Sequence, residues 1–197
     1  MAVFDYDEPD RFTTGTVGEP GQRTFFLQAR SGHRITSVAL EKQQVAVLAE
    51  RVEELLDEVV RRSGGTAPVP AMAPAEQIDN APLDVPIEED FRVASMSLTW
   101  DGELERVIIE CREVAEPDDD DDDDLEGLVD GDDQSPDLGL SAVQGSLLRV
   151  AITGVQARIF AHRAAAVVAQ GRPPCPFCGN PLDPQGHICP RANGYRR

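Results

Sequence analysis

Two segments of the chain, residues 38–51 and 150–163, resemble each other at a constant offset of 112 positions. Several aligned positions exchange one apolar residue for another, and five are identical: Val38 with Val150, Ala39 with Ala151, Gln44 with Gln156, Ala49 with Ala161, and Arg51 with Arg163. Similar segments at a fixed spacing indicate an internal repeat, whose copies adopt the same local structure. We therefore expect the chain to fold as two related units.

The first half of the chain has the pattern of three strands followed by a helix. The strands are expected at residues 12–17, 23–30 and 33–40. Ser31 and Gly32 are expected to form a two-residue hairpin turn between the last two strands. A helix is expected over residues 42–62, where apolar side chains recur at helical spacing: Val45, Leu48, Ala49, Val52, Leu55, Leu56 and Val59.

The second half repeats this order of elements. Its strands are expected at residues 91–100, 104–114 and 147–152, and Asp101 and Gly102 are a hairpin turn signal. Thr153 and Gln156 have the spacing of a capping box, which marks the start of a helix that runs to about residue 170. The lone Cys111 falls within a strand, where a small buried side chain is its expected role.

The expected fold is α+β, with two βββα units related by a pseudo-twofold axis. A three-stranded unit with one apolar face is marginal alone. The two units should therefore share a mainly antiparallel sheet or a barrel-like core covered by two helices. Residues 1–172 would form this body, with halves at 1–65 and 91–172. Residues 66–90 are rich in proline, alanine and acidic residues, which indicates a linker or a loop draped over the surface.

The charge is concentrated in one segment. The net charge is −18, and thirteen of the acidic residues lie in residues 116–137, which contain no basic residue, so the rest of the chain carries −5. Like charges repel one another and the segment has no core of its own, so a disordered acidic loop is expected. A mildly acidic body is a poor general binder of nucleic acid.

The chain shows no signal for export or for a membrane span. It has no run of eighteen apolar residues, and its first residues are acidic rather than typical of a signal peptide. Four cysteines without an export signal favour a reducing compartment. We therefore expect a cytoplasmic location.

Three of the four cysteines and one histidine are clustered near the C-terminus. Two residues separate Cys175 from Cys178, and a stretch of eight residues leads from Cys178 to His187, with Cys189 close behind. Three thiolates and an imidazole are a donor set typical of a tetrahedral structural zinc ion. Residues 173–197 are therefore expected to form a zinc-ribbon-like appendage that Zn²⁺ holds together.

Other interpretations of this cluster stay open. A redox Cys-x-x-Cys motif normally begins a helix after a strand, whereas Gly179, Asn180 and Pro181 follow Cys178. Disulfides would require an oxidising compartment. A catalytic zinc would keep one coordination position open for water, which four good ligands oppose.

A second group of residues suits contacts with anions. The C-terminal tail offers phosphate or base contacts through Arg191, Tyr195, Arg196 and Arg197, the alternative being a solubilising end. The loop at residues 15–21, with Arg23, could bind an anion through backbone amides, and a structural hairpin turn is the alternative. His33 and His162 have no acid or nucleophile nearby in sequence and are expected at the surface.

The stretches 15–29, 38–51, 171–179 and 187–196 carry a family resemblance that extends over nearly the whole chain. In these stretches the chain resembles an uncharacterised actinobacterial family, domain of unknown function 3090. The resemblance implies an actinobacterial, cytoplasmic source. It implies no activity, substrate or catalytic residue.

Three kinds of function fit these features. A binding or adaptor protein, whose zinc ribbon docks an unknown protein partner, is favoured because the sequence has no catalytic constellation and the zinc shell is full. The first alternative is a nucleic-acid-binding protein that uses the ribbon and the Arg-rich tail. The second is an enzyme with a pocket between the two halves, for which a deep polar pocket lined by histidine or carboxylates would be evidence.

Overall fold

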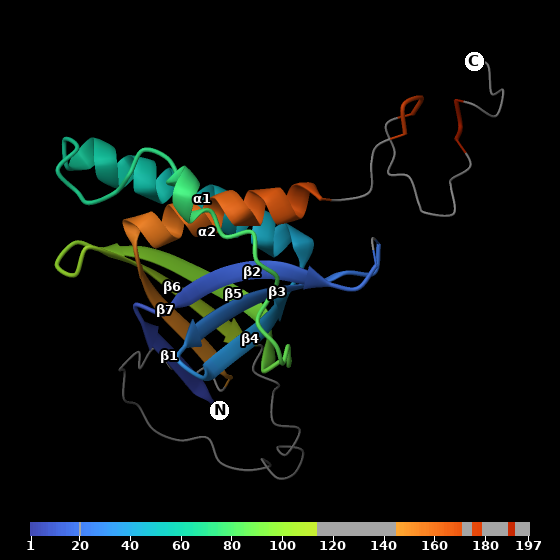
Figure 1. Ribbon diagram of the computed structural model, residues 1–197, viewed down its shortest axis with the longest axis horizontal. Helices are drawn as coiled ribbons and strands as arrows, with labels where there is room; N and C mark the ends of the chain where they lie inside the picture. The colour runs from blue at the N-terminus through green and yellow to red at the C-terminus, as the bar shows by residue number, and fades with distance from the viewer. Residues whose placement is uncertain (20, 114–144, 171–174, 179–188, 192–197) are drawn as a thin grey trace, which may run out of the picture.

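The computed structural model describes residues 1–19, 21–113, 145–170, 175–178 and 189–191. Among these residues, two helices lie against each other over one face of a seven-stranded mixed sheet (Figure 1). The helices are α1 (Lys42–Arg62) and α2 (Gly154–Ala169), and a short 3-10 helix, η1, spans Ala75–Gln77. The strands are β1 (Val3–Asp7), β2 (Arg11–Val17), β3 (Thr24–Ser31), β4 (Arg34–Leu40), β5 (Phe91–Asp101), β6 (Arg106–Glu113) and β7 (Leu147–Thr153).

The strands follow the order β1-β7-β6-β5-β4-β3-β2 across the sheet. β2, β3 and β4 form one antiparallel meander, and β5, β6 and β7 form a second. Parallel pairing of β4 with β5 joins the two meanders, and β1 pairs parallel with β7. The α+β class is confirmed, but among the described residues the sheet is open and does not close into a barrel. Three strands precede the helix in the second half, as predicted, whereas the first half has four strands before its helix because β1 precedes β2.

The strand β1 was not predicted. Its sequence is rich in aspartate, which is depleted in strands, and Val3 is exposed. Tyr6 is fully buried, and its hydroxyl lies 2.8 Å from the hydroxyl of Thr36 in β4. Because β1 pairs with β7, which begins at Leu147, the contacts that form this strand lie far away in the sequence.

The turn between β3 and β4 differs by one residue from the prediction. Ser31 pairs with Arg34, so the two-residue loop is 32–33 instead of 31–32. Gly32 takes the first loop position with a φ of 58°, a left-handed conformation that glycine adopts without steric cost.

The turn between β5 and β6 is longer than the prediction. Asp101 pairs with Arg106, so the loop spans residues 102–105 and Asp101 itself ends β5. The Asp101 carboxylate stabilises the loop because its Oδ1 accepts hydrogen bonds of 2.9 Å from the amides of Glu103 and Leu104. The predicted hairpin is present, with an aspartate turn at its start.

Both helices begin at a capping box, and the one predicted at Thr153 and Gln156 is confirmed. The apolar face of α1 is buried as predicted, except that Leu55 is only partly buried. Phe160 of α2 stacks on Phe12 of β2, with ring centroids 4.6 Å apart. Side chains from α1, α2 and the sheet thus form one hydrophobic cluster that spans both halves of the chain.

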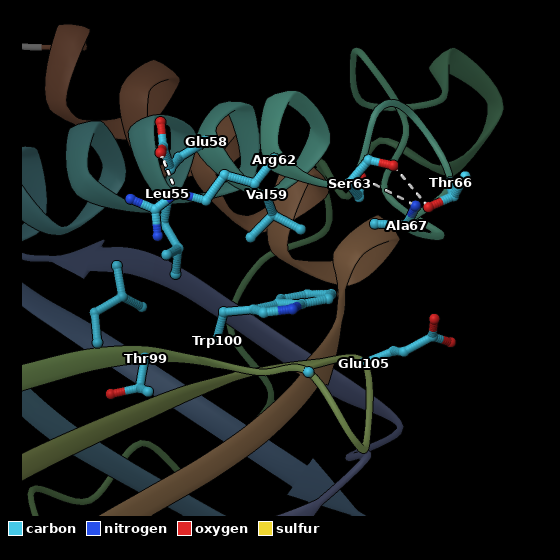
Figure 2. A pocket seen from close by; sticks show the side chains of 12 residues that line it. Leu55, Glu58, Val59, Arg62, Ser63, Thr66, Ala67, Thr99, Trp100 and Glu105 are labelled. Atoms are coloured by element: carbon cyan, nitrogen blue, oxygen red, sulfur yellow. Dashed lines mark hydrogen bonds and ion pairs between the residues drawn. The ribbon is translucent and has the colours of Figure 1, made fainter.

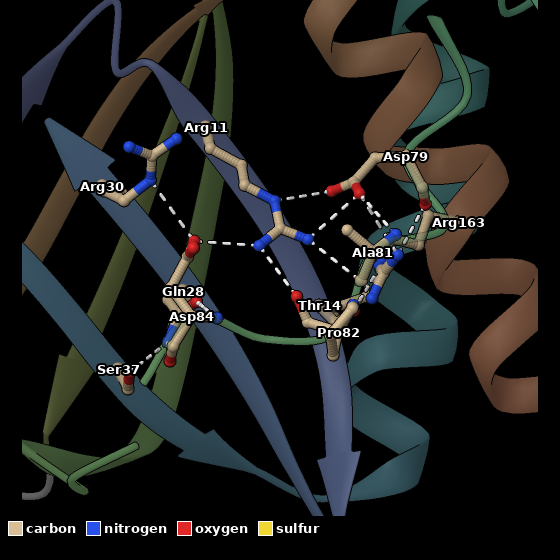
Figure 3. A network of polar contacts seen from close by, with 10 residues as sticks. All are labelled: Arg11, Thr14, Gln28, Arg30, Ser37, Asp79, Ala81, Pro82, Asp84 and Arg163. Carbon is tan, nitrogen blue, oxygen red and sulfur yellow. Dashed lines mark hydrogen bonds and ion pairs between the residues drawn. The ribbon is translucent and has the colours of Figure 1, made fainter. Parts of the chain in front are cut away.

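Residues 66–90, here called the strap, lie on the outside of the body but are firmly anchored. Arg11 of β2 donates hydrogen bonds of 2.8 Å to the carboxylates of Asp79 and Asp84 (Figure 3). Arg163 of α2 donates to the Asp79 carbonyl at 2.5 Å. The strap is therefore held to both a strand and a helix by charge-assisted hydrogen bonds.

The far end of the strap packs on the sheet face opposite the helices. Leu83 is buried against Phe26 and Ala39. The residues on either side of Phe26 and Ala39 in their strands face the main core, so alternation places Phe26 and Ala39 on the opposite face. Gln28 donates to the Asp84 carbonyl at 3.0 Å and accepts a 2.8 Å bond from the Asp84 amide. The strap thus crosses from the end of α1 to the other side of the sheet before it enters β5 (Figure 1).

Candidate metal centre

Three of the four predicted metal ligands lie together in the structure. The sulfur atoms of Cys175, Cys178 and Cys189 all lie within 4.8 Å of one another. The Sγ atoms of Cys175 and Cys189 are 3.8 Å apart, and both side chains are buried. The remaining predicted ligand, His187, lies outside the described residues.

The sulfur separation fits a shared metal ion. Two thiolates on one tetrahedral zinc ion, each about 2.3 Å from the metal, are roughly 3.8 Å apart. A disulfide would bring two sulfurs to about 2.05 Å, and none of the four cysteines, all of which the structure describes, forms one. The arrangement matches metal ligation in both distance and donor type.

The surroundings of Cys175 favour its thiolate form. Burial raises the pKa of this thiol. Hydrogen bonds from the backbone amides of Cys178 and Phe177, and from the thiols of Cys178 and Cys189, lower the pKa by more, so it lies below its ordinary value. The thiolate is the form that binds metal. The short turn at residues 175–178 supplies these amides, so the Cys-x-x-Cys spacing itself creates the favourable site.

Cys111 does not belong to this centre. It is buried in β6 at 1% exposure, and burial together with Glu110 raises the pKa of its thiol to about 12. It is therefore a neutral core side chain, as predicted from its place in a strand.

The structure places the predicted anion-contact residues in two separate locations. Arg191 lies beside the cysteine turn, where its Nη1 donates to the Phe177 carbonyl at 3.2 Å. Arg23 lies at the end of α2, where its Nη1 donates to the Gln170 carbonyl at 2.8 Å. Tyr195, Arg196 and Arg197 lie outside the described residues.

Residues 15–17 of the predicted anion-binding loop belong to β2, and the described residues 18, 19 and 21 lie in the turn that follows it. Gly18 and Gly21 both have a φ of 104°, and the Gln22 amide donates to the Glu19 carbonyl at 2.9 Å. A Cβ atom on Gly18 would approach the Gln22 carbonyl oxygen to 2.8 Å. Backbone conformation thus explains these glycines, and anion binding stays a prediction.

An exposed aromatic side chain in the cysteine turn was missed by the sequence reasoning. Phe177, between the first two cysteines, is 63% exposed. Its position inside the Cys-x-x-Cys motif was the available signal, because the two residues between closely spaced cysteines lie in a short turn that leaves their side chains no space to fold inward.

A groove of about 940 Å³ lies between the two helices and the strap. Its walls are mostly alanine, and its polar lining residues are Glu50, Glu53 and His162. Glu53 is engaged by the buried guanidinium of Arg158. The described lining contains no serine, threonine or cysteine, so this groove offers no hydroxyl or thiol nucleophile.

Comparison with known proteins identifies the family. A family model described as "Protein of unknown function (DUF3090)" matches residues 4–189. The chain belongs to this family. No curated protein and no solved structure matches the chain. The match covers the body and the three clustered cysteines, so the family includes both.

No helix among the described residues combines the length and the apolar character needed to cross a membrane.

Proposed function

We propose that the chain binds one structural zinc ion through Cys175, Cys178, His187 and Cys189. The observation that supports this most strongly is the 3.8 Å separation between the Cys175 and Cys189 sulfurs, which fits two ligands of one tetrahedral ion. The spacing of His187 in the sequence makes it the natural fourth donor. Four protein ligands fill the shell, so the ion would hold the C-terminal segment in shape and activate no water.

Metal analysis tests this proposal directly. The purified protein is expected to contain about one equivalent of zinc, because the site has a single set of four donors. Cys178→Ser and His187→Ala should each lose it, whereas Cys111→Ser, which alters a cysteine outside the cluster, should retain it. Full retention of zinc by Cys178→Ser would remove the site as proposed.

The zinc-bound segment then serves as a docking surface of a binding or adaptor protein. Phe177 projects into solvent from the cysteine turn, and the Arg191 guanidinium lies against the same turn. Aromatic residues and arginine are enriched where proteins bind one another, because a planar ring buries much apolar area at little entropic cost. A protein partner that covers Phe177 accounts for an exposed aromatic ring at a rigid site.

The docking role is tested with variants that separate the metal from the surface. Pull-down from host cells followed by mass spectrometry should recover a partner with the wild-type protein and lose it with Phe177→Ala, although that variant keeps its zinc. Met72→Ala removes another exposed apolar side chain, on the strap, and serves as the control. Equal recovery by Phe177→Ala and wild type would contradict docking through this ring.

A nucleic-acid-binding function is the second candidate. The same pair, Phe177 and Arg191, would suit a base that stacks and a phosphate, and Arg196 and Arg197 would add positive charge. The net charge of −18 opposes this function. Binding of single-stranded RNA or DNA that weakens steeply with salt, and is lost in Arg191→Ala, would favour it over a protein partner.

The third candidate, an enzyme with a pocket between the halves, has less support. The groove between the helices and the strap is lined mostly by alanine, and the polar residues among its described lining are Glu50, Glu53 and His162. A cytoplasmic location and an actinobacterial source stay predictions.

We also propose that the two halves are duplicated units related by a pseudo-twofold axis. Equivalent residues make equivalent contacts, which supports the proposal. The Gln44 side-chain amide donates to the Val93 carbonyl at 3.0 Å, and that of Gln156 donates to the Pro9 carbonyl at 3.1 Å. Val38 and Val150 are also equivalent, and each pairs with a residue of a parallel strand. Val38 pairs with Phe91 of β5, and Val150 pairs with Tyr6 of β1.

A further inference from the structure

A second candidate site lies in the body, independent of the metal centre. A pocket of about 610 Å³ opens between the last turns of α1 and the β5–β6 hairpin (Figure 2). This volume is in the range of small-molecule sites, about 300–1,000 Å³. Its walls come from three segments, namely α1 of the first half, the start of the strap, and the hairpin of the second half.

The floor of this pocket is the only tryptophan of the chain. Trp100 is half-buried, and its ring lies beneath the end of α1 near Val59 (Figure 2). Leu55, Val59 and Leu98 supply the other apolar lining. A tryptophan face bordered by aliphatic side chains is a surface on which a planar ring stacks favourably.

Two polar groups that border this pocket, one inside it and one at its rim, have no partner within the described part of the chain. The Trp100 indole N–H makes no hydrogen bond there, and the Glu105 carboxylate makes neither a hydrogen bond nor an ion pair. Trp100 pairs with Val107, which is fully buried on the helix side, and Glu105 precedes Val107 by two residues. Because side chains alternate along a strand, Trp100 lies on the face toward α1. Glu105 lies in the turn before β6, where its exposed side chain borders the rim of the pocket (Figure 2).

Four other polar residues that line the pocket are already engaged. Arg62 forms an ion pair with Glu58, which also pairs with Arg61. The Ser63 hydroxyl donates to the Val60 carbonyl, and the Thr66 hydroxyl donates to the Ser63 carbonyl. Thr99 also lines the pocket, but it neighbours Trp100 along β5 and its hydroxyl points away from α1 (Figure 2). The donor and the acceptor that are left for a ligand are therefore the indole N–H and the Glu105 carboxylate.

We propose that this pocket binds a small molecule with a planar nitrogen heterocycle. The ring would stack on the face of Trp100, and a ring N–H or amino group would donate to Glu105. The indole N–H lies in the plane of the Trp100 ring, so it would donate to an acceptor on a substituent that extends beyond the stacked ring. A saturated ring of the same size that carries an amino group could still donate to Glu105 but could not stack on the indole face.

The single tryptophan makes the test direct. Adenine, cytosine and nicotinamide serve as probes, titrated into the full-length protein while tryptophan emission is followed with selective excitation. At least one probe is expected to give a saturable change in emission, and calorimetry should give the same dissociation constant. Cyclohexylamine should give no saturable change. Absence of saturation with all three probes, or equal binding of cyclohexylamine, would overturn the proposal.

Two variants locate the binding. Gly102 lines the pocket, and a Cβ atom there would lie 3.8 Å from the Trp100 indole nitrogen, so Gly102→Val should obstruct the ring site and weaken binding by at least about tenfold. Glu105→Gln, a surface change that keeps the fold, should weaken it roughly threefold to tenfold. Leu104→Ala, on the same hairpin but outside the lining, is the matched control and should bind like wild type. Unaltered binding by both pocket variants would contradict the assignment.

Discussion

The body and the cysteine cluster differ in what holds their residues together. In the body, buried side chains of α1, α2 and the sheet form one continuous cluster. Among the described residues after α2, only Cys175 and Cys189 are buried, and Phe177 is exposed. Apolar burial stabilises in proportion to area, so the body has a source of stability that the cysteine cluster lacks.

Because of this difference, the body and the cysteine segment should lose their structure independently of each other. Loss of packing should unfold the body whether or not metal is bound, and loss of metal should release the cysteine segment without unfolding the body. The strap provides an intermediate case, because ion pairs as well as apolar contacts hold it. The following predictions test this comparison through the stability of the body, from the largest effect to the smallest.

The largest effect is expected from Phe160→Ala. The Phe160 ring is fully buried and stacks on Phe12, so truncation leaves a cavity in the shared core. The free energy of unfolding should fall by about 3–5 kcal/mol, measured by urea denaturation with circular dichroism. Val47→Ala, at a largely exposed position of α1, should change it by less than about 0.5 kcal/mol. Equal effects of the two variants would mean that the helices are not packed as described.

A smaller loss is expected from Arg158→Met. The Arg158 side chain is 2% exposed and joins Glu53, Asp57 and the Pro70 carbonyl, thereby fixing the start of the strap to both helices. Its partners are exposed enough to regain water, so the loss should be about 1–3 kcal/mol. Removal of the exposed pair of Arg51 with Glu54 by Arg51→Ala should cost less than about 0.5 kcal/mol.

The strap should also give stability a dependence on pH through Asp79. Burial raises the pKa of this carboxyl, but the bonds from Arg11 and the Ala81 amide outweigh it, so the folded-state pKa is lower than the ordinary value. Such a group stabilises the fold above its ordinary pKa of about 3.9, and that contribution is lost as pH falls through the lower folded-state pKa.

Asp79→Asn should therefore be less stable than wild type at pH 7, by roughly 1 kcal/mol. The difference between the two proteins should shrink as the pH falls below about 4. Urea denaturation at several pH values measures it, with Glu76→Gln on the same strap as a control. A difference that stays constant down to pH 2 would contradict an anchoring role for the ionised carboxylate.

The smallest effect on the body is expected from Cys178→Ser. This variant should lose the proposed zinc ion, yet the urea midpoint of the body should match that of wild type, because the hydrophobic cluster contains no residue of the cysteine segment. Treatment of wild type with a chelator should have the same result. Global unfolding on metal loss would show that the cysteine segment and the body form one cooperative unit.

Local patterns in the sequence were sufficient for most of the individual elements. The spacing of Val45, Leu48 and Val52 predicted α1, and the Thr153–Gln156 capping box predicted the start of α2. The cysteine cluster was predictable for the same reason, since Cys175 and Cys178 are two residues apart and Cys189 follows closely. Each of these features depends on residues that are close to one another in the sequence. Over such short distances, the spacing of residues along the chain largely determines how their side chains lie relative to one another.

Contacts between distant residues decided the rest. β1 exists because it pairs with β7, the strap is fixed because Asp79 meets Arg11, and the Trp100 pocket forms because the β5–β6 hairpin faces the end of α1. None of these partners is marked by a local pattern. The sequence by itself thus determined which segments become helices, most of the strands, and which cysteines cluster near the C-terminus. Only the tertiary structure decided which of them meet, because many pairings of amphipathic elements can bury similar apolar area and side-chain contacts across the fold select one.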